Sequence, residues 1–252
     1  MARIAAIIAA AVFLAAGTIS ARAEPLANTC TKTYAPQTLD MSQPLNLGQL
    51  KKQVHFYACS GAYDSDLDKV LAEAKAYVEM RAAQVVMPAI VLDIDETSLS
   101  NLPQELANDF GFIKKAPCID LPKGPCGWDD WTAKSYANAI DGTLALFNAA
   151  KARKVAVFFI TGRKLSEDQK DNDPLYKATV KNLTKAGYAH WDGLTLRPKK
   201  DNRTVAKYKS GERAKIAEHY TIIVNVGDQH SDLAGGYAER AYKLPNPFYF
   251  IP

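Results

Sequence analysis

Residues 88–103, PAIVLDIDETSLSNLP, decide the fold that this sequence predicts. The run 89–92 is apolar and rich in β-branched side chains, which indicates a short strand buried on both faces. Asp93, Asp95 and Glu96 follow it directly. Carboxylates this close repel one another where water is partly excluded, so one must hold a proton or a cation must lie among them. In an α/β protein, ligands bind at this end of a strand.

Two further strands end in the same way. Residues 155–160 form an apolar run that ends in Thr-Gly-Arg at 161–163, and residues 221–226 lead into GDQHSD at 227–232. An acidic turn that caps a helix with residues 97–98 would explain the first strand end alone. It does not explain why another strand again delivers acids at its carboxyl end. The repetition favours a functional site.

The acids after the third strand indicate a metal site. Asp228 and Asp232 are four positions apart, across a turn. Carboxylate oxygens without clustered thiolates are the ligands that a hard cation such as Mg²⁺ selects. We therefore expect Mg²⁺ as the cofactor.

The first 23 residues have the features of a secretory signal peptide. An apolar run at 4–16 follows a basic start and precedes the small-x-small cleavage site at 21–23. The run is short for a membrane span. Cys30 does not follow the site in a lipobox-like context. We expect residues 1–23 to be cleaved, leaving a soluble exported protein without a membrane anchor.

The remaining residues, 24–252, are enough for one domain with a sizeable core and a small inserted cap. Residues 1–23 carry Arg3 and Arg22 and no acid, so their removal lowers the formal charge from +4 to +2. This charge argues against a dedicated nucleic-acid binder, because no Lys/Arg block or aromatic-basic pattern accompanies it. We expect no nucleic-acid polymer as a partner.

The chain contains four cysteines, Cys30, Cys59, Cys118 and Cys126. In an exported protein an even number favours disulfides, and three pairings are open. We favour the nearest-neighbour scheme, Cys30–Cys59 with Cys118–Cys126. A zinc site is the weaker alternative, because none of the histidines lies at a ligand-like spacing from a cysteine pair.

Helical periodicity is clear in the middle of the chain, whereas residues 24–63 contain prolines and few periodic signals and are expected to be irregular. Ser65 offers a cap for the first helix. The expected elements are helices at 65–84, 139–153 and 173–186, a helix opened by 208–210, and a strand at 194–196.

Residues 98–150 interrupt the strand-helix pattern and are the expected cap. An insertion directly after a catalytic strand often forms a lid. Trp128 and Trp131 fall inside it. Two tryptophans three apart can stack on a planar ligand or cover a core edge.

Four motifs in order resemble those of the haloacid dehalogenase (HAD) superfamily of phosphatases: DIDET at 93–97, ITGR at 160–163, Lys209, and GDQHSD at 227–232. The resemblance runs from about Leu67 to the end of the chain. It is closest to the secreted acid phosphatases of the third subclass, which include plant vegetative storage protein-like enzymes and bacterial class C enzymes. The resemblance implies a HAD-like Rossmannoid α/β fold, a three-layer sandwich around a parallel sheet.

The same resemblance assigns catalytic roles. Asp93 would be the nucleophile that becomes an aspartyl phosphate. Asp95 would protonate the leaving alcohol and then activate the hydrolytic water. Thr161, Gly162 and Lys209 would hold the phosphoryl oxygens.

The metal would be bound by aspartates, with the backbone carbonyl of Asp95 as a further ligand. A dianionic phosphate can approach these carboxylates only with a cation present. The metal residues implied are Asp93, Asp95, Asp228 and Asp232.

The resemblance leaves the substrate open within the phosphate monoesters. The ending LPNPFY resembles that of nucleotidase-like members, which brings Tyr249 near the substrate. If Trp128 and Trp131 stack on a base, nucleoside monophosphates are favoured.

Two alternatives remain: a catalytically silent storage or binding protein of the same fold, and a phosphotransferase that uses an alcohol in place of water. We expect the protein in the periplasm or the medium, because the chain lacks a lipid-anchoring cysteine. A homodimer is left open.

Overall fold

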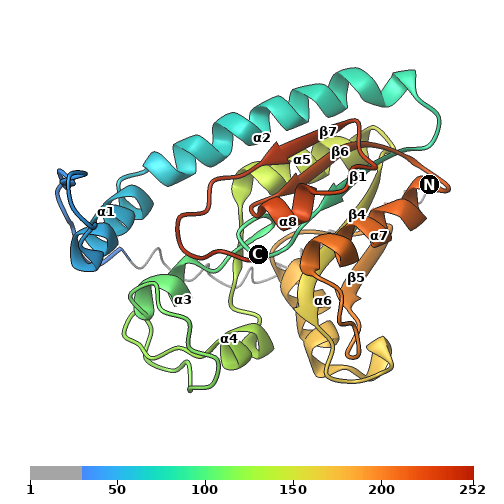
Figure 1. Cartoon of the computed structure of the whole chain (residues 1–252). Helices are drawn as coiled ribbons and strands as arrows, with labels where there is room; N and C mark the ends of the chain where they lie inside the picture. The colour runs from blue at the N-terminus through green and yellow to red at the C-terminus, as the bar shows by residue number, and fades with distance from the viewer. Residues whose placement is uncertain (1–29) are drawn as a thin grey trace, which may run out of the picture.

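The strand that precedes Asp93 lies at the centre of a five-stranded parallel sheet (Figure 1). The computed structural model describes residues 30–252, so the expected signal peptide lies outside the described residues. The sheet has the order β5-β4-β1-β6-β7. Its strands are β1 (Pro88–Leu92), β4 (Ala156–Lys164), β5 (Gly193–Arg197), β6 (Thr221–Gly227) and β7 (Arg240–Lys243).

Helices cover both faces of this sheet, as the alternation of side chains in the strands requires. Ile90 and Leu92 belong to the larger core, which lies under α2 (Ala62–Arg81) and α5 (Asp141–Ala152). Val91 points to the other face and packs with Tyr208 of α7 (Val205–Ala217). The remaining helices of the layers are α6 (Pro174–Lys185) and α8 (His230–Leu233), with the 3-10 turns Ala82–Gln84 and Lys170–Asn172. The predicted α/β three-layer fold is confirmed.

A small lobe, seen below the sheet in Figure 1, is inserted after β1. It contains α3 (Leu102–Ala107) and α4 (Trp128–Lys134), and its two ends pair as the antiparallel strands β2 (Leu99–Ser100) and β3 (Asn138–Ala139). Helix α5 packs on α2 and β4. We therefore propose that the cap ends near residue 140, rather than near 150 as expected.

The prediction that residues 24–63 are irregular was wrong, because α1 (Leu47–Cys59) lies there. The side chain of Asn46 caps it by accepting from the backbone N–H of Gln49 at 3.2 Å. Ala58 is its one fully buried residue, so its apolar stripe is weak in the sequence.

The other elements match their predicted positions with shifted ends. The first long helix begins at Ala62 rather than Ser65, after Gly61 in the left-handed region at φ 84°. Helix α7 begins at Val205, where Thr204 caps it. Strand β7 was not expected.

Both expected disulfides are present, Cys30–Cys59 and Cys118–Cys126. The first joins the start of the described chain to the end of α1, and the second closes a loop in the cap. The zinc alternative is therefore wrong for these cysteines. Within residues 30–252, the helices are too short or too polar to cross a membrane.

Candidate active site

The loop after β1 is held in place by its own backbone. The N–H of Asp93 donates to the carbonyl of Val226 at 3.0 Å, which continues the pairing of β1 with β6. The hydroxyl of Ser98 donates to the carbonyl of Asp93 at 2.6 Å, and Tyr188 Oη donates to that of Ser98 at 2.8 Å. Glu96 takes a left-handed conformation, φ 52°, which turns the chain back. These bonds fix the direction of the Asp93 side chain.

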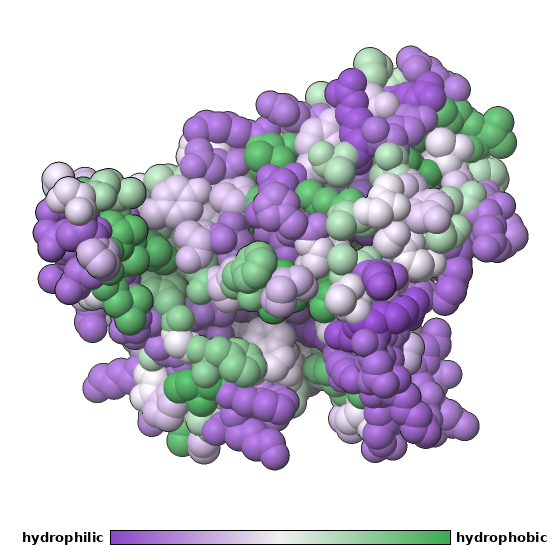
Figure 2. Space-filling model, viewed as in Figure 1, coloured by the Kyte–Doolittle hydropathy of each residue, from purple (hydrophilic) through white to green (hydrophobic). Residues whose placement is uncertain are grey.

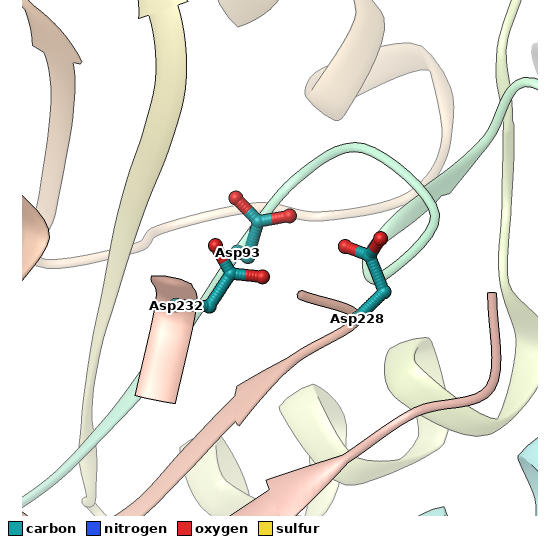
Figure 3. Close-up of side chains that lie close together, drawn as sticks. All are labelled: Asp93, Asp228 and Asp232. Atoms are coloured by element: carbon teal, nitrogen blue, oxygen red, sulfur yellow. The ribbon is translucent and has the colours of Figure 1, made fainter. Parts of the chain in front are cut away.

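Asp93, Asp228 and Asp232 form an acidic cluster. One carboxylate oxygen of each lies within 4.8 Å of those of the others. Figure 3 shows the three side chains facing a common space from the ends of β1 and β6 and from α8. A Cβ on Gly227 would lie 2.3 Å from the Cβ of Asp232. Glycine is therefore needed there for Asp232 to reach the cluster.

Lys209 joins the cluster from α7. Its Nζ donates to Oδ1 of Asp93 and, at 2.6 Å, to Oδ1 of Asp232. Burial disfavours its charged form, but the carboxylates of Asp232 and Asp93 outweigh burial and raise the pKa of Lys209. The side chain is therefore a permanent cation between the two acids.

The carboxyls of Asp93 and Asp228 both have raised pKa values, chiefly because burial disfavours the charged forms. For Asp93, the attraction of Lys209 opposes this rise, and the charges of Asp232 and Asp228 add to it. One lysine does not neutralise three buried carboxylates. A cation bound by carboxylate oxygens would remove the excess negative charge, so these residues fit the expected metal.

Asp95 lies apart from this cluster. Arg163 holds it through both oxygens, from Nη2 to Oδ1 at 2.7 Å and from Nε to Oδ2 at 3.0 Å. Its side chain is 15% exposed, whereas that of Asp93 is 7% exposed. The two aspartates therefore differ in partner and in access to solvent, as separate roles require. The side chain of Asp95 does not belong to the acidic cluster of the described residues, which leaves its backbone carbonyl for the expected metal contact.

The phosphate-binding residues predicted after the second strand lie at the end of β4. Thr161 is fully buried, and its hydroxyl oxygen accepts from the backbone N–H of Arg163 at 3.1 Å. A Cβ on Gly162 would meet only Val205, at an ordinary 3.7 Å. Crowding therefore does not require glycine here.

The predicted substrate-binding residues lie in different environments. Trp131 is 1% exposed, and Trp128 is half-buried with the guanidinium carbon of Arg163 5.7 Å from its ring centroid. Burial, followed by the charges of Asp228 and Glu96, raises the pKa of Tyr249, so its hydroxyl lies near the acids. Figure 2 shows the surface in the view of Figure 1 hollowed between the lobe of α3 and α4 and the lobe of α6. Trp128 and Tyr249 fit a substrate role better than Trp131.

Sequence reasoning missed the residues that hold the acids through hydrogen bonds. Besides Arg163, they include Asn246 and Gln229, whose amide nitrogens donate to Oδ2 of Asp228 at 2.7 and 2.6 Å. The hydroxyl of Thr97 donates to the other oxygen of Asp228 at 3.1 Å. The ending LPNPFY at 244–249 is the sequence signal for Asn246, but its resemblance to nucleotidase-like members points to Tyr249 alone.

The model of the HAD superfamily, subfamily IIIB (acid phosphatase), matches residues 21–252. The chain belongs to this subfamily. The predicted membership of the HAD acid phosphatases and the predicted enzyme class, a phosphoric monoester hydrolase, are thereby confirmed.

Plant proteins are among the similar sequences. "Acid phosphatase 1" of Solanum lycopersicum is 33% identical over 199 residues, covering 77% of this chain and 72% of the relative. "Vegetative storage protein 2" of Arabidopsis thaliana is 40% identical over 196 residues, covering 77% and 68%. The subfamily thus includes relatives named as enzymes and relatives named as storage proteins.

A solved structure shares the fold. The class C acid phosphatase of Bacillus anthracis, with tungstate bound, superimposes with a TM-score of 0.59 at 22% identity. The match covers 80% of this chain and 86% of that one.

Proposed function

We propose that the chain is an exported, Mg²⁺-dependent acid phosphatase that hydrolyses phosphate monoesters through an aspartyl phosphate at Asp93. The observation that carries this proposal is the division of the acids. Asp93 is buried against Lys209 in the acidic cluster, and Asp95 is held separately by Arg163 with access to solvent. A nucleophile and a proton donor need these different environments.

In the first step, a carboxylate oxygen of Asp93 attacks phosphorus, and the bond between phosphorus and the leaving oxygen breaks. Asp95 gives its proton to that oxygen. Lys209 lies at the nucleophile and attracts the phosphoryl oxygens, together with Thr161 and the backbone at Gly162. In the second step, Asp95 takes a proton from water, which attacks the aspartyl phosphate and releases inorganic phosphate.

The metal residues are Asp93, Asp228, the backbone carbonyl of Asp95, and Asp232 directly or through water. Bound Mg²⁺ supplies the positive charge that lets a dianionic phosphate enter a site of carboxylates. Asp232 also accepts from Lys209 and, at 2.9 Å, from the backbone N–H of Gln229. It therefore orients the lysine as well.

Nucleoside monophosphates are the substrates that the aromatic side chains beside the acids support best. The half-buried ring of Trp128 and the ring of Tyr249 lie near Arg163 and the acids and can stack on a base. Both disulfides support export to the periplasm or the medium, because disulfides persist in oxidising compartments.

The test is a hydrolysis screen of the exported chain with Mg²⁺, using nucleotides, sugar phosphates and aryl phosphates. We expect phosphate release that EDTA abolishes and Mg²⁺ restores. Asp93→Asn should lower turnover at least about 1,000-fold with an unchanged fold by circular dichroism. A wild-type chain that releases no phosphate from any of these compounds would support the storage alternative. Activity that survives in Asp93→Asn would overturn the assignment of Asp93 as the nucleophile.

Glycerol added during hydrolysis tests the phosphotransferase alternative. Phosphotransfer predicts glycerol phosphate as a product alongside inorganic phosphate. Its absence leaves water as the acceptor.

A further inference from the structure

Asn101 is the N-cap residue that directly precedes helix α3, yet its side chain makes no capping hydrogen bond. Asparagine at this position usually accepts a hydrogen bond from one of the first free N–H groups. Here the N–H of Leu102 donates to Ser100 Oγ at 3.2 Å, Pro103 has none, and that of Gln104 donates to the backbone carbonyl of Asn101 at 2.9 Å. The start of the helix is satisfied without the amide of Asn101.

The amide lies instead between the acid and the cap. Its Nδ2 donates to Oδ1 of Asp95 at 3.1 Å, and its Oδ1 accepts from Nε1 of Trp131 at 2.8 Å. The indole N–H can only donate, so it fixes which end of the amide faces Asp95. Asn101 is fully buried, so water does not compete for these bonds.

The backbone of Asn101 is held by Glu96, the acid that has no assigned catalytic role. Oε1 of Glu96 accepts from the N–H of Asn101, and Oε2 accepts from Tyr63 Oη at 2.8 Å. Glu96 is fully buried, and its left-handed backbone brings this side chain under the loop. Helix α2, the loop after β1 and the cap thus meet at Asn101.

Together with Arg163, this arrangement makes the two oxygens of Asp95 different. Oδ1 accepts from Arg163 Nη2 and from Asn101 Nδ2, whereas Oδ2 accepts only from Arg163 Nε among the described residues. A carboxylate oxygen accepts about two hydrogen bonds. Oδ1 is therefore filled, and Oδ2 keeps an acceptor site.

We propose that Asn101 is a positioning residue for Asp95, held by Trp131 and Glu96 so that proton transfer to the leaving oxygen takes place through Oδ2. This inference rests on the proposed function. It assigns the buried Trp131 and Glu96 to one task, which is to keep the proton donor in a single orientation. Proximity and orientation of this kind contribute strongly to catalysis.

The test is Asn101→Ala, assayed with an alkyl phosphate and with p-nitrophenyl phosphate. An alkoxide needs a proton as it leaves, whereas p-nitrophenolate is a weak base and leaves without one. The value of kcat/KM covers the steps up to the breaking of this bond. We expect kcat/KM to fall about 100-fold for the alkyl phosphate and less than about threefold for the aryl phosphate. Trp131→Phe, which keeps a ring but loses the N–H, should shift the ratio in the same direction by less.

The matched control is Asn108→Ala, at the other end of α3. Its amide bonds the backbone of Cys126 at 2.7 and 2.9 Å, so its loss loosens the cap without a change at Asp95. We expect the same factor for both substrates. Thermal melts verify that each variant is folded. If Asn101→Ala does not fold, Glu96→Gln is a second variant in which to measure the ratio of the kcat/KM losses for the alkyl and aryl phosphates.

The possible failures are distinguishable. An equal loss for both substrates in Asn101→Ala, with an active wild type, overturns the positioning role and leaves the phosphatase proposal intact. A wild type inactive on both overturns the proposed function and this inference with it.

Discussion

Arg163 donates to both carboxylate oxygens of Asp95, at 2.7 and 3.0 Å, across 68 positions of the chain. The guanidinium is itself buried, donates from Nη1 to Thr179 Oγ1 at 3.0 Å, and lies over the ring of Trp128. It is fixed on three sides, so the orientation of Asp95 is fixed with it. The neighbouring acid, Asp93, pairs with Lys209 instead.

Replacing this guanidinium by an ammonium tests the arrangement. Lysine carries the charge of arginine but not its planar pair of donors, so Arg163→Lys should loosen Asp95 and leave it the hydrogen bond from Asn101. We expect kcat to fall about 10- to 100-fold in steady-state assays. The control is Arg153→Lys, a surface residue that pairs with Glu79 at 3.2 Å, which should keep full activity. A wild-type kcat in Arg163→Lys would show that the paired hydrogen bonds from Arg163 to Asp95 are not needed.

Asn246 should tune the affinity for the metal, since it donates to Oδ2 of Asp228. Partners of this kind orient a metal ligand, and their loss typically lowers metal affinity about 10- to 100-fold. Asn246→Ala should therefore raise the Mg²⁺ concentration that gives half-maximal activity by this factor. Activity at saturating Mg²⁺ should recover most of its wild-type value.

The control for this titration is Asn202→Ala, at an exposed position of the loop before α7. It should reproduce the wild-type Mg²⁺ curve. An Asn246→Ala curve that also superimposes on the wild type contradicts a role in metal binding.

Trp128 should affect substrate selection more than chemistry. Base–aromatic stacking contributes about 1–3 kcal/mol per base. Trp128→Ala is therefore expected to raise KM for a nucleoside monophosphate about 10-fold and to change KM for glycerol phosphate little. Equal changes for the two substrates would assign the ring to packing against Arg163. Trp191→Phe, a change at a partly buried ring that packs on Phe159, is a control for general loosening.

Glu105 predicts a pH dependence of stability. Burial raises the pKa of Glu105 from 4.5 to about 7. Below pH 4.5 both the folded and the unfolded states hold the proton. Between the two values only the folded state holds it, so the free energy of unfolding falls as pH rises and levels off above 7. The total loss is at most about 3 kcal/mol.

Glu105→Gln removes the titrating carboxyl, so this pH dependence of the free energy of unfolding should be lost. Urea unfolding at pH 4.5 and pH 8 should show a smaller fall for the variant than for the wild type, by about 2 kcal/mol. Glu73→Gln, on the exposed face of α2, should follow the wild type because that carboxyl is not buried on folding. Parallel curves for Glu105→Gln and the wild type would contradict the shift.

The sheet and the acids at its edge were predictable because each depends on local patterns. The run before Asp93 is apolar at every position and rich in β-branched residues, which is typical of a buried strand, and parallel strands bring their carboxyl ends to one edge. Lys209 became identifiable only through the order of the motifs. Its sequence context, one lysine among several in a helix, resembles a solvated surface.

The contacts that organise the site were not predictable, because each joins side chains far apart in sequence. Nothing near Arg163 indicates that its partner is Asp95, and Asn101 at the start of a helix has the sequence of an ordinary cap. The tryptophans were ambiguous for the same reason. Whether Trp131 stacks on a ligand or donates to Asn101 depends on how the cap folds back.

The central position of β1 also matters during synthesis. Its β4 side can pair once residues up to 164 are made, but its other side stays open until β6 begins at Thr221. An open edge of an apolar strand is a template for pairing with other chains. Polypeptides that end before β6, whether nascent or cut by a protease, therefore expose an aggregation-prone edge on the strand that carries Asp93.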